Sequence, residues 1–148
     1  LLRYLKKIFY NSVAELRKTM IRQDYIIRMI QEIFAAIANL ILRRKHISKS
    51  DWEEYESTAR QVLEVTPRQL EEMDGQTILE KYSQGKDGME KTELAAMMLL
   101  KMAEDTENLV PKARLRQEGL YLLKYVQEHG NTYSLPRNLL IQFLESRN

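Results

Sequence analysis

Residues 26–42 read IIRMIQEIFAAIANLIL, and this stretch decides the fold. Apolar residues recur in it at intervals of four, three, four and three, which is the heptad spacing of a helix that buries a seam along one side. Further apolar residues flank this seam, so the apolar surface is wider than a lone surface helix needs. The pattern predicts a long helix over about residues 21–45 that other helices or a partner must cover. The residues predicted to form an interface are Ile26, Ile30, Ile33, Phe34, Ile37, Leu40 and Ile41.

The rest of the chain also shows helical periodicity, and no segment shows the alternation typical of a strand. Apolar residues at intervals of three and four predict an amphipathic helix over residues 2–18, which we expect to dock on the helix at 21–45. Two longer helices over about 91–106 and 111–128 are joined by a short connection, which predicts an antiparallel hairpin. We therefore predict an all-α fold, a helical bundle of six to eight helices in one domain spanning residues 1–148.

Short sequence patterns predict where helices begin, and one glycine predicts a close contact between two helices. Ser50 with Glu53 has the spacing of a capping box, and so does Thr66 with Gln69. Gly119 lies inside a predicted helix, where glycine costs up to about 1 kcal/mol relative to alanine, so we expect another helix to pack closely there. The chain begins with leucine; we interpret Met20 as a native start and residues 1–19 as an extension before it.

Charge is distributed unevenly, although the net charge is only +2. Residues 1–45 hold ten basic and three acidic side chains, whereas the remaining residues hold 13 basic and 18 acidic ones. A solvated face explains such a cluster, and so does attraction to an anionic surface or to the acidic part of a second copy. The predicted basic patch consists of Lys6, Lys7, Arg17, Lys18, Arg43, Arg44 and Lys45.

We expect no transmembrane segment. The most apolar window, residues 33–42, has half of the ~20 residues that a spanning helix requires. Extending it toward Met20 brings in four charged side chains, each of which is costly in lipid. The basic amphipathic helix at residues 2–18 instead leaves the surface of an anionic membrane as a candidate partner.

No catalytic, cofactor or metal site can be assembled from the sequence. The chain has no cysteine, and its two histidines, His46 and His129, lack the spacing of a zinc motif. The Gly85–Gly88 loop fails as a calcium loop because Leu94 stands where a bidentate glutamate is needed. There is no nucleophile elbow or glycine-rich phosphate loop. We therefore predict that the protein is not an enzyme and has no cofactor.

Residues 59–70 resemble the helix-turn-helix of bacterial regulators, but Glu64 stands where the turn glycine belongs. The recognition helix would carry Glu71, Glu72 and Asp74, which repel phosphate, so we expect this segment not to bind DNA, and nucleic acid is an unlikely partner. The methionines Met97, Met98 and Met102 have helical spacing, which fits a core stripe or an adaptable partner groove.

From Met20 onward, the chain resembles a family of small uncharacterised bacterial all-helical proteins. The residues that carry the resemblance are Gln23–Ile30, Leu63–Thr66 with Leu70, the Gly85–Asp87 turn, Leu94-Ala95 with Leu99-Leu100, and Gly119–Leu123. The resemblance implies a tetratricopeptide-like hairpin toward the C-terminus, and it brings no catalytic residues.

Together these patterns predict a non-catalytic, cytoplasmic helical interaction or scaffold module that self-associates through the helix at about 21–45. The alternative is a peripheral membrane protein or a nucleic-acid-binding protein that works through its basic N-terminal third.

Overall fold

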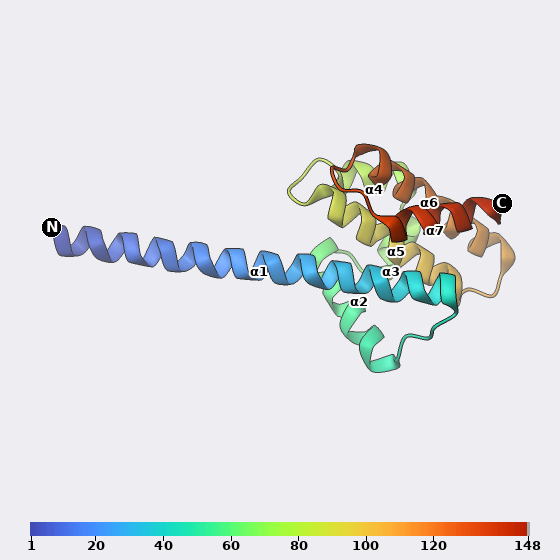
Figure 1. Ribbon diagram of the computed structural model, residues 1–148, viewed down its shortest axis with the longest axis horizontal. Coiled ribbons are helices and arrows are strands. Elements are labelled where there is room, and N and C mark those ends of the chain that lie inside the picture. The colour runs from blue at the N-terminus through green and yellow to red at the C-terminus, as the bar shows by residue number, and fades with distance from the viewer. Residues whose placement is uncertain (148) are drawn as a thin grey trace.

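The computed structural model describes residues 1–147, apart from the side chains of Thr19 and Ile21. Seven α-helices and no strands make up this part of the chain (Figure 1). The all-α prediction is confirmed, and the number of helices falls within the predicted range. In chain order the helices are α1 (Leu2–Arg43), α2 (Lys49–Leu63), α3 (Pro67–Glu72), α4 (Gly75–Tyr82), α5 (Gly88–Asp105), α6 (Leu109–His129) and α7 (Leu135–Ser146).

The central helix of the bundle is α5, which packs against α1, α2, α3, α4 and α6. Its sequence explains this position, because residues 94–100 read LAAMMLL and all seven side chains are buried. A helix that is apolar on every side can only lie in the interior. Met97 and Met98 belong to this run and Met102 packs against its edge, so the methionines form core rather than a partner groove.

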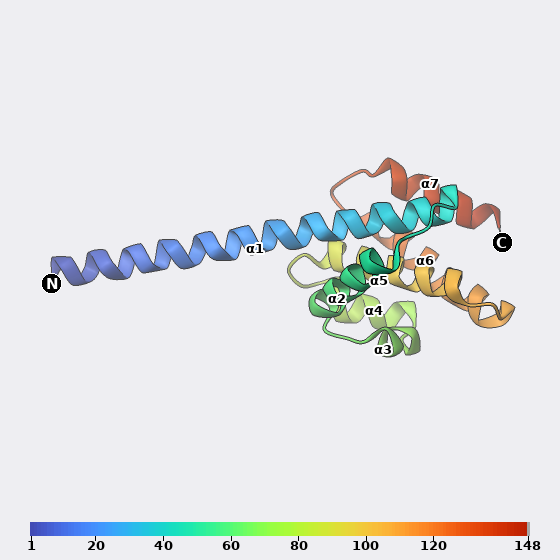
Figure 2. The ribbon, with the colours of Figure 1, turned by 90° about the horizontal axis from the view of Figure 1, so that it is seen from below.

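The predicted antiparallel hairpin is formed by α5 and α6, which are joined by residues 106–108. A Cβ atom on Gly119 of α6 would lie 2.7 Å from Cδ2 of Leu100 on α5. The close packing expected at this glycine is therefore confirmed. Helix α7 lies against α6 and α1, and it closes the bundle beside the hairpin (Figure 2).

The structure corrects two local predictions. Residues 2–18 and 21–45 are not two helices but one, since α1 is continuous over 42 residues. The first glycine and the first proline of the chain come after residue 43, so nothing in this stretch breaks a helix. The N-cap of α2 is Ser48, whose Oγ accepts a hydrogen bond from the backbone N–H of Asp51, and not Ser50. The capping box of Thr66 and Gln69 is present as predicted.

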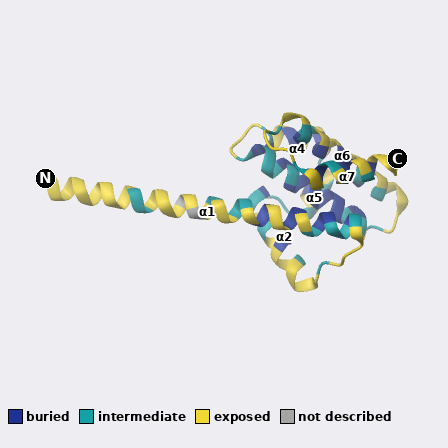
Figure 3. Ribbon diagram, viewed as in Figure 1, coloured by how far each residue is buried: buried dark blue, intermediate teal, exposed yellow. Residues whose placement is uncertain are grey.

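The first half of α1 extends away from the other six helices (Figures 1 and 2). Its first buried residue is Met29, whereas the N-terminal turns are coloured almost entirely as exposed in Figure 3. A helix of 42 residues is about 63 Å long. The part of it that extends beyond the other helices is comparable in length to the bundle itself (Figure 1). This arrangement contradicts the expectation that residues 2–18 dock on the following helix.

Candidate functional site

The predicted interface residues lie mainly in the core of the bundle. Ile30, Ile33, Phe34, Ile37 and Ile41 are all buried, and Ile26 and Leu40 are partly buried. The helices that cover them are α2, α5 and α7 of the same chain. In this fold the five buried side chains have no surface to offer a partner, so the seam of α1 is the bundle's own core. Self-association cannot use these five buried side chains while the bundle is folded.

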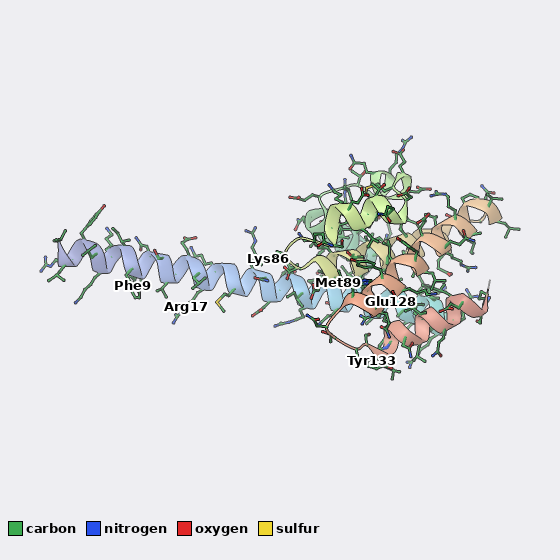
Figure 4. The ribbon with its side chains drawn as sticks, turned by 90° about the horizontal axis from the view of Figure 1, so that it is seen from above. Phe9, Arg17, Lys86, Met89, Glu128 and Tyr133 are labelled. Carbon is green, nitrogen blue, oxygen red and sulfur yellow. The ribbon has the colours of Figure 1, made fainter. Side chains whose placement is uncertain are left out.

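Residues 2–22, which we call the projecting segment, provide such a surface. Five apolar side chains at intervals of three, four, seven and four form a stripe along it, and they are between 53% and 75% exposed. We call these residues the apolar stripe: Leu2, Leu5, Phe9, Leu16 and Met20. Figure 4 shows Phe9 on the part of α1 that extends beyond all other helices. An uncovered stripe of this length is unusual, because helices in water take most of their stability from packing an apolar face.

The apolar stripe lies on the same side of α1 as the bundle. Eighteen residues make five full helical turns, so residues that far apart point in the same direction. Leu16 therefore points as Phe34 does, and Met20 points as Ala38 does; Phe34 and Ala38 are both buried in the bundle. The stripe thus prolongs the core-facing side of α1 beyond the edge of the bundle.

Two basic side chains of the projecting segment, Arg17 and Lys7, point the other way. Arg17 points as Ala35 does, and Lys7 points as Tyr25 does, because the members of each pair are eighteen residues apart. Ala35 and Tyr25 are both exposed. Figure 4 shows Arg17 clear of the other helices. Apart from the paired Glu15 and Lys18, whose ion-pair distance is 3.9 Å, the segment is strongly basic.

The structure divides the predicted basic patch into two clusters at opposite ends of α1. Lys6, Lys7, Arg17 and Lys18 lie on the projecting segment, whereas residues 43–45 lie at the C-terminal end of α1. Lys18 and Arg43 are separated by about 37 Å along the helix. In the second cluster, Nη1 of Arg44 lies 3.7 Å from Oε2 of Glu104 on α5, so part of its charge is offset within the bundle.

A shallow groove runs along α6 and has a volume of about 500 Å³. It is lined by Gln117, Leu120, Tyr121, Lys124, Tyr125 and Glu128. The Tyr121 hydroxyl donates a hydrogen bond to Gln76 on α4, and the Tyr125 ring stacks on His129. The six lining residues include no nucleophile with an adjacent base.

The polar groups in the interior have structural partners. The Arg137 guanidinium on α7 binds Glu93 on α5, Gln127 on α6 and the carbonyl of Thr132. The Tyr82 hydroxyl donates to the Leu63 carbonyl over 2.7 Å, and burial raises the pKa of Tyr82 to about 12. Within residues 1–147, no group of three or more acidic, histidine or cysteine side chains could hold a metal ion.

Helix α1 is also the one described helix that is long and apolar enough to cross a membrane. In its most apolar 18-residue stretch, 39% of the residues are buried inside the bundle. The core helix of a water-soluble bundle meets the same criteria, so length and composition alone do not assign a membrane span.

Comparisons with protein-family models, with curated proteins and with solved structures give no match to this chain.

Proposed function

We propose that the protein is a non-catalytic helical scaffold module that self-associates through the projecting segment of α1. The observation that carries this proposal is the apolar stripe, which the bundle leaves uncovered over about 20 residues. Covering these side chains removes apolar area from water, which stabilises an interface by roughly 25 cal/mol per Å² before the costs of association.

The proposal keeps the predicted role of α1 but moves the interface along it. The seam residues that we predicted as an interface hold the bundle together, and the apolar stripe is left for a second copy. The family resemblance in the bundle and the tetratricopeptide-like character of the α5–α6 hairpin remain predictions, as do the bacterial origin and the cytoplasmic location.

Light scattering coupled to size exclusion tests the proposal. We expect the chain, whose mass is 17.6 kDa, to elute with about twice that mass. Leu5→Asp/Phe9→Asp places two carboxylates in the stripe and should give the monomer mass. The matched control is Leu109→Asp/Val110→Asp, which changes two apolar residues that are 81% and 82% exposed at the start of α6. This control should keep the mass of the unchanged chain.

A chain that stays at 17.6 kDa up to about 100 μM would contradict the proposal, because this concentration detects dimers whose association free energy is as weak as about −5 to −6 kcal/mol. A control variant that also becomes monomeric would show that the loss is not specific to the stripe.

A second candidate function rests on the basic side chains of the projecting segment. An amphipathic helix with a basic polar face can lie on an anionic membrane. Sedimentation with phosphatidylserine vesicles at low and high salt tests this candidate, since screening weakens attraction between exposed charges. Binding to DNA would be tested in the same way, although the acidic helix α3 offers no surface for it.

A further inference from the structure

One side of α1 faces away from the bundle along the whole helix. Nine residues make two and a half turns, so Arg28 points away from Ile37, which is fully buried. Tyr10 is eighteen residues before Arg28 and therefore points in the same direction as Arg28. We call the surface within about 60° of this direction the outer side of α1. Tyr10 and Arg28 are both exposed, so the outer side continues from the projecting segment to the bundle.

Basic residues outnumber acidic ones on the outer side. Its basic members, all exposed, are Arg3, Lys6, Lys7, Arg17, Arg28 and Arg43. Its acidic members are Asp24 and Glu32, and the Glu32 side chain is hydrogen-bonded to Tyr55 on α2. These cations extend over about 60 Å along α1. They suit a partner that presents many negative charges over the same length, and each of them strengthens binding to an anionic membrane about fivefold.

The tyrosines and the shape of the outer side favour a membrane over a nucleic acid duplex. Tyr10 is 74% exposed and Tyr25 is 54% exposed, and both lie among the basic residues of the outer side. Tyrosine is enriched at the level of the lipid headgroups, where its ring is partly shielded and its hydroxyl stays in water. The major groove of DNA admits a single helix, whereas α2 and α7 pack against the second half of α1. A broad, flat surface can contact the outer side over its whole length.

The apolar stripe cannot make the same contact with a membrane. It lies on the side of α1 that faces the bundle, and α2, α5 and α7 occupy that side from Met29 onward. Packed helices lie 8–10 Å apart between axes, and an interfacial helix enters a membrane by only about 5–10 Å. A membrane that touched the stripe would therefore run into the bundle.

Resting on the second candidate function, we infer that the outer side of α1, and not the apolar stripe, binds the surface of an anionic membrane. The basic side chains face the negatively charged lipid headgroups, and Tyr10 and Tyr25 lie at headgroup level. The apolar stripe stays free for a second copy, so membrane binding and self-association use different sides of the same helix.

Vesicle sedimentation with charge reversals tests this surface. The full chain should bind phosphatidylserine vesicles at low salt, and high salt or pure phosphatidylcholine vesicles should abolish binding. Lys6→Glu/Arg17→Glu reverses two charges on the outer side and should weaken binding at least about a hundredfold. The matched control is Lys81→Glu/Lys124→Glu, which changes the net charge equally on α4 and α6, two helices that pack against α5. It should weaken binding by less than about tenfold, because these side chains lie away from the outer side.

Single-cysteine labels show which side of α1 touches lipid, because the chain has no cysteine of its own. Ala35→Cys lies on the outer side beside the bundle, and Ser12→Cys lies on the side of the apolar stripe, seven residues after Leu5. Ala35 and Ser12 are both exposed, so each position can carry an environment-sensitive fluorophore. Phosphatidylserine vesicles should raise the fluorescence of the label at position 35 and leave that of the label at position 12 unchanged.

The outcomes separate this inference from self-association. A fluorescence change at position 12 alone would place the stripe in lipid and overturn the inference, and a monomeric mass in the same sample would overturn self-association as well. An equal loss of binding in the control variant would show unspecific charge attraction and overturn the inference. A dimer that binds no vesicles would overturn the inference and leave self-association intact. Salt-sensitive binding to duplex DNA but not to vesicles would also overturn it and assign the outer side to nucleic acid.

Discussion

Arg137 connects three helices through a single buried guanidinium. Its Nη1 lies 2.6 Å from Oε2 of Glu93, and its side chain is 6% exposed, against 18% for that of Glu93. The other nitrogens donate to Gln127 and to the carbonyl of Thr132. Burial raises the pKa of Glu93, and the hydrogen bond and charge of Arg137 oppose this rise. Removing either partner of this pair would therefore leave the other charged group unpaired in the interior.

Arg137→Met should lower the free energy of unfolding by about 3 kcal/mol at pH 7, because it leaves the Glu93 carboxylate unpaired. Without the arginine, the pKa of Glu93 in the folded state rises further above its ordinary value. The deficit is then full above this raised pKa, shrinks as the pH falls from it toward the ordinary value and is gone below the ordinary value, since the folded state accepts the proton more readily. Urea unfolding at pH 7 and pH 4 measures both effects.

Lys124→Met is the matched control, since Lys124 and Glu145 lie 4.0 Å apart and are about half exposed. It should change stability by no more than about 0.5 kcal/mol. The double variant Arg137→Met/Glu93→Leu should lose less than the sum of the single variants. A simple sum would show that the two side chains act independently.

At the scale of elements, helix α1 combines two environments on one side of one helix. On the side that faces the bundle, the apolar side chains after Met29 are buried, whereas those of the apolar stripe before Gln23 are exposed. The periodicity is the same in both halves, which is why the sequence predicts apolar helices in both places and cannot say which half is covered. That difference depends on where α2, α5 and α7 pack, which is a property of the tertiary fold.

Substitutions in the two halves should therefore act on different properties. Ile30→Asp/Ile37→Asp places two carboxylates at positions that are 3% and 0% exposed, and it should unfold the bundle. Leu5→Asp/Phe9→Asp should leave the free energy of unfolding of the bundle within about 0.5 kcal/mol of that of the unchanged chain, because exposed sites tolerate change. Far-ultraviolet circular dichroism in urea measures both. If the Ile30→Asp/Ile37→Asp variant stays folded and only loses its partner chain, so that its mass in solution falls, the interface would lie at the seam residues after all.

The fold could be predicted better than the site, because some features depend on neighbouring residues and others on contacts between distant parts of the chain. Thr66 and Gln69, which are three residues apart, cap a helix. Glycine is unfavourable inside a helix, so Gly119 indicates that another helix packs closely against it. Both features can therefore be recognised in the local sequence. The pairing of Glu93 with Arg137 joins residues 44 positions apart, and neither residue has a local pattern that marks it. The eighteen-residue relation between Leu16 and Phe34 was present in the sequence. It became informative only once Phe34 was known to be buried.

At the scale of the whole molecule, the bundle and the projecting segment should differ in what stabilises them. The bundle has a continuous core that includes residues from all seven helices. None of the described side chains of the projecting segment before Gln23 is buried, and helices of this length without packing are marginal in water. If a second copy supplies the packing, the helix of the segment is coupled to association, whereas the core of the bundle is not.

Thermal unfolding followed by circular dichroism at 222 nm should therefore show two transitions. The first should be small, correspond to the projecting segment, and move to lower temperature on dilution, because each tenfold dilution weakens association by about 1.4 kcal/mol. The second should be larger and independent of concentration, since it reports the bundle. Leu5→Asp/Phe9→Asp should lack the first transition at every concentration and keep the second. One concentration-independent transition for the unchanged chain would mean that the segment holds its helix without a partner, and the apolar stripe would then need no second copy to explain it.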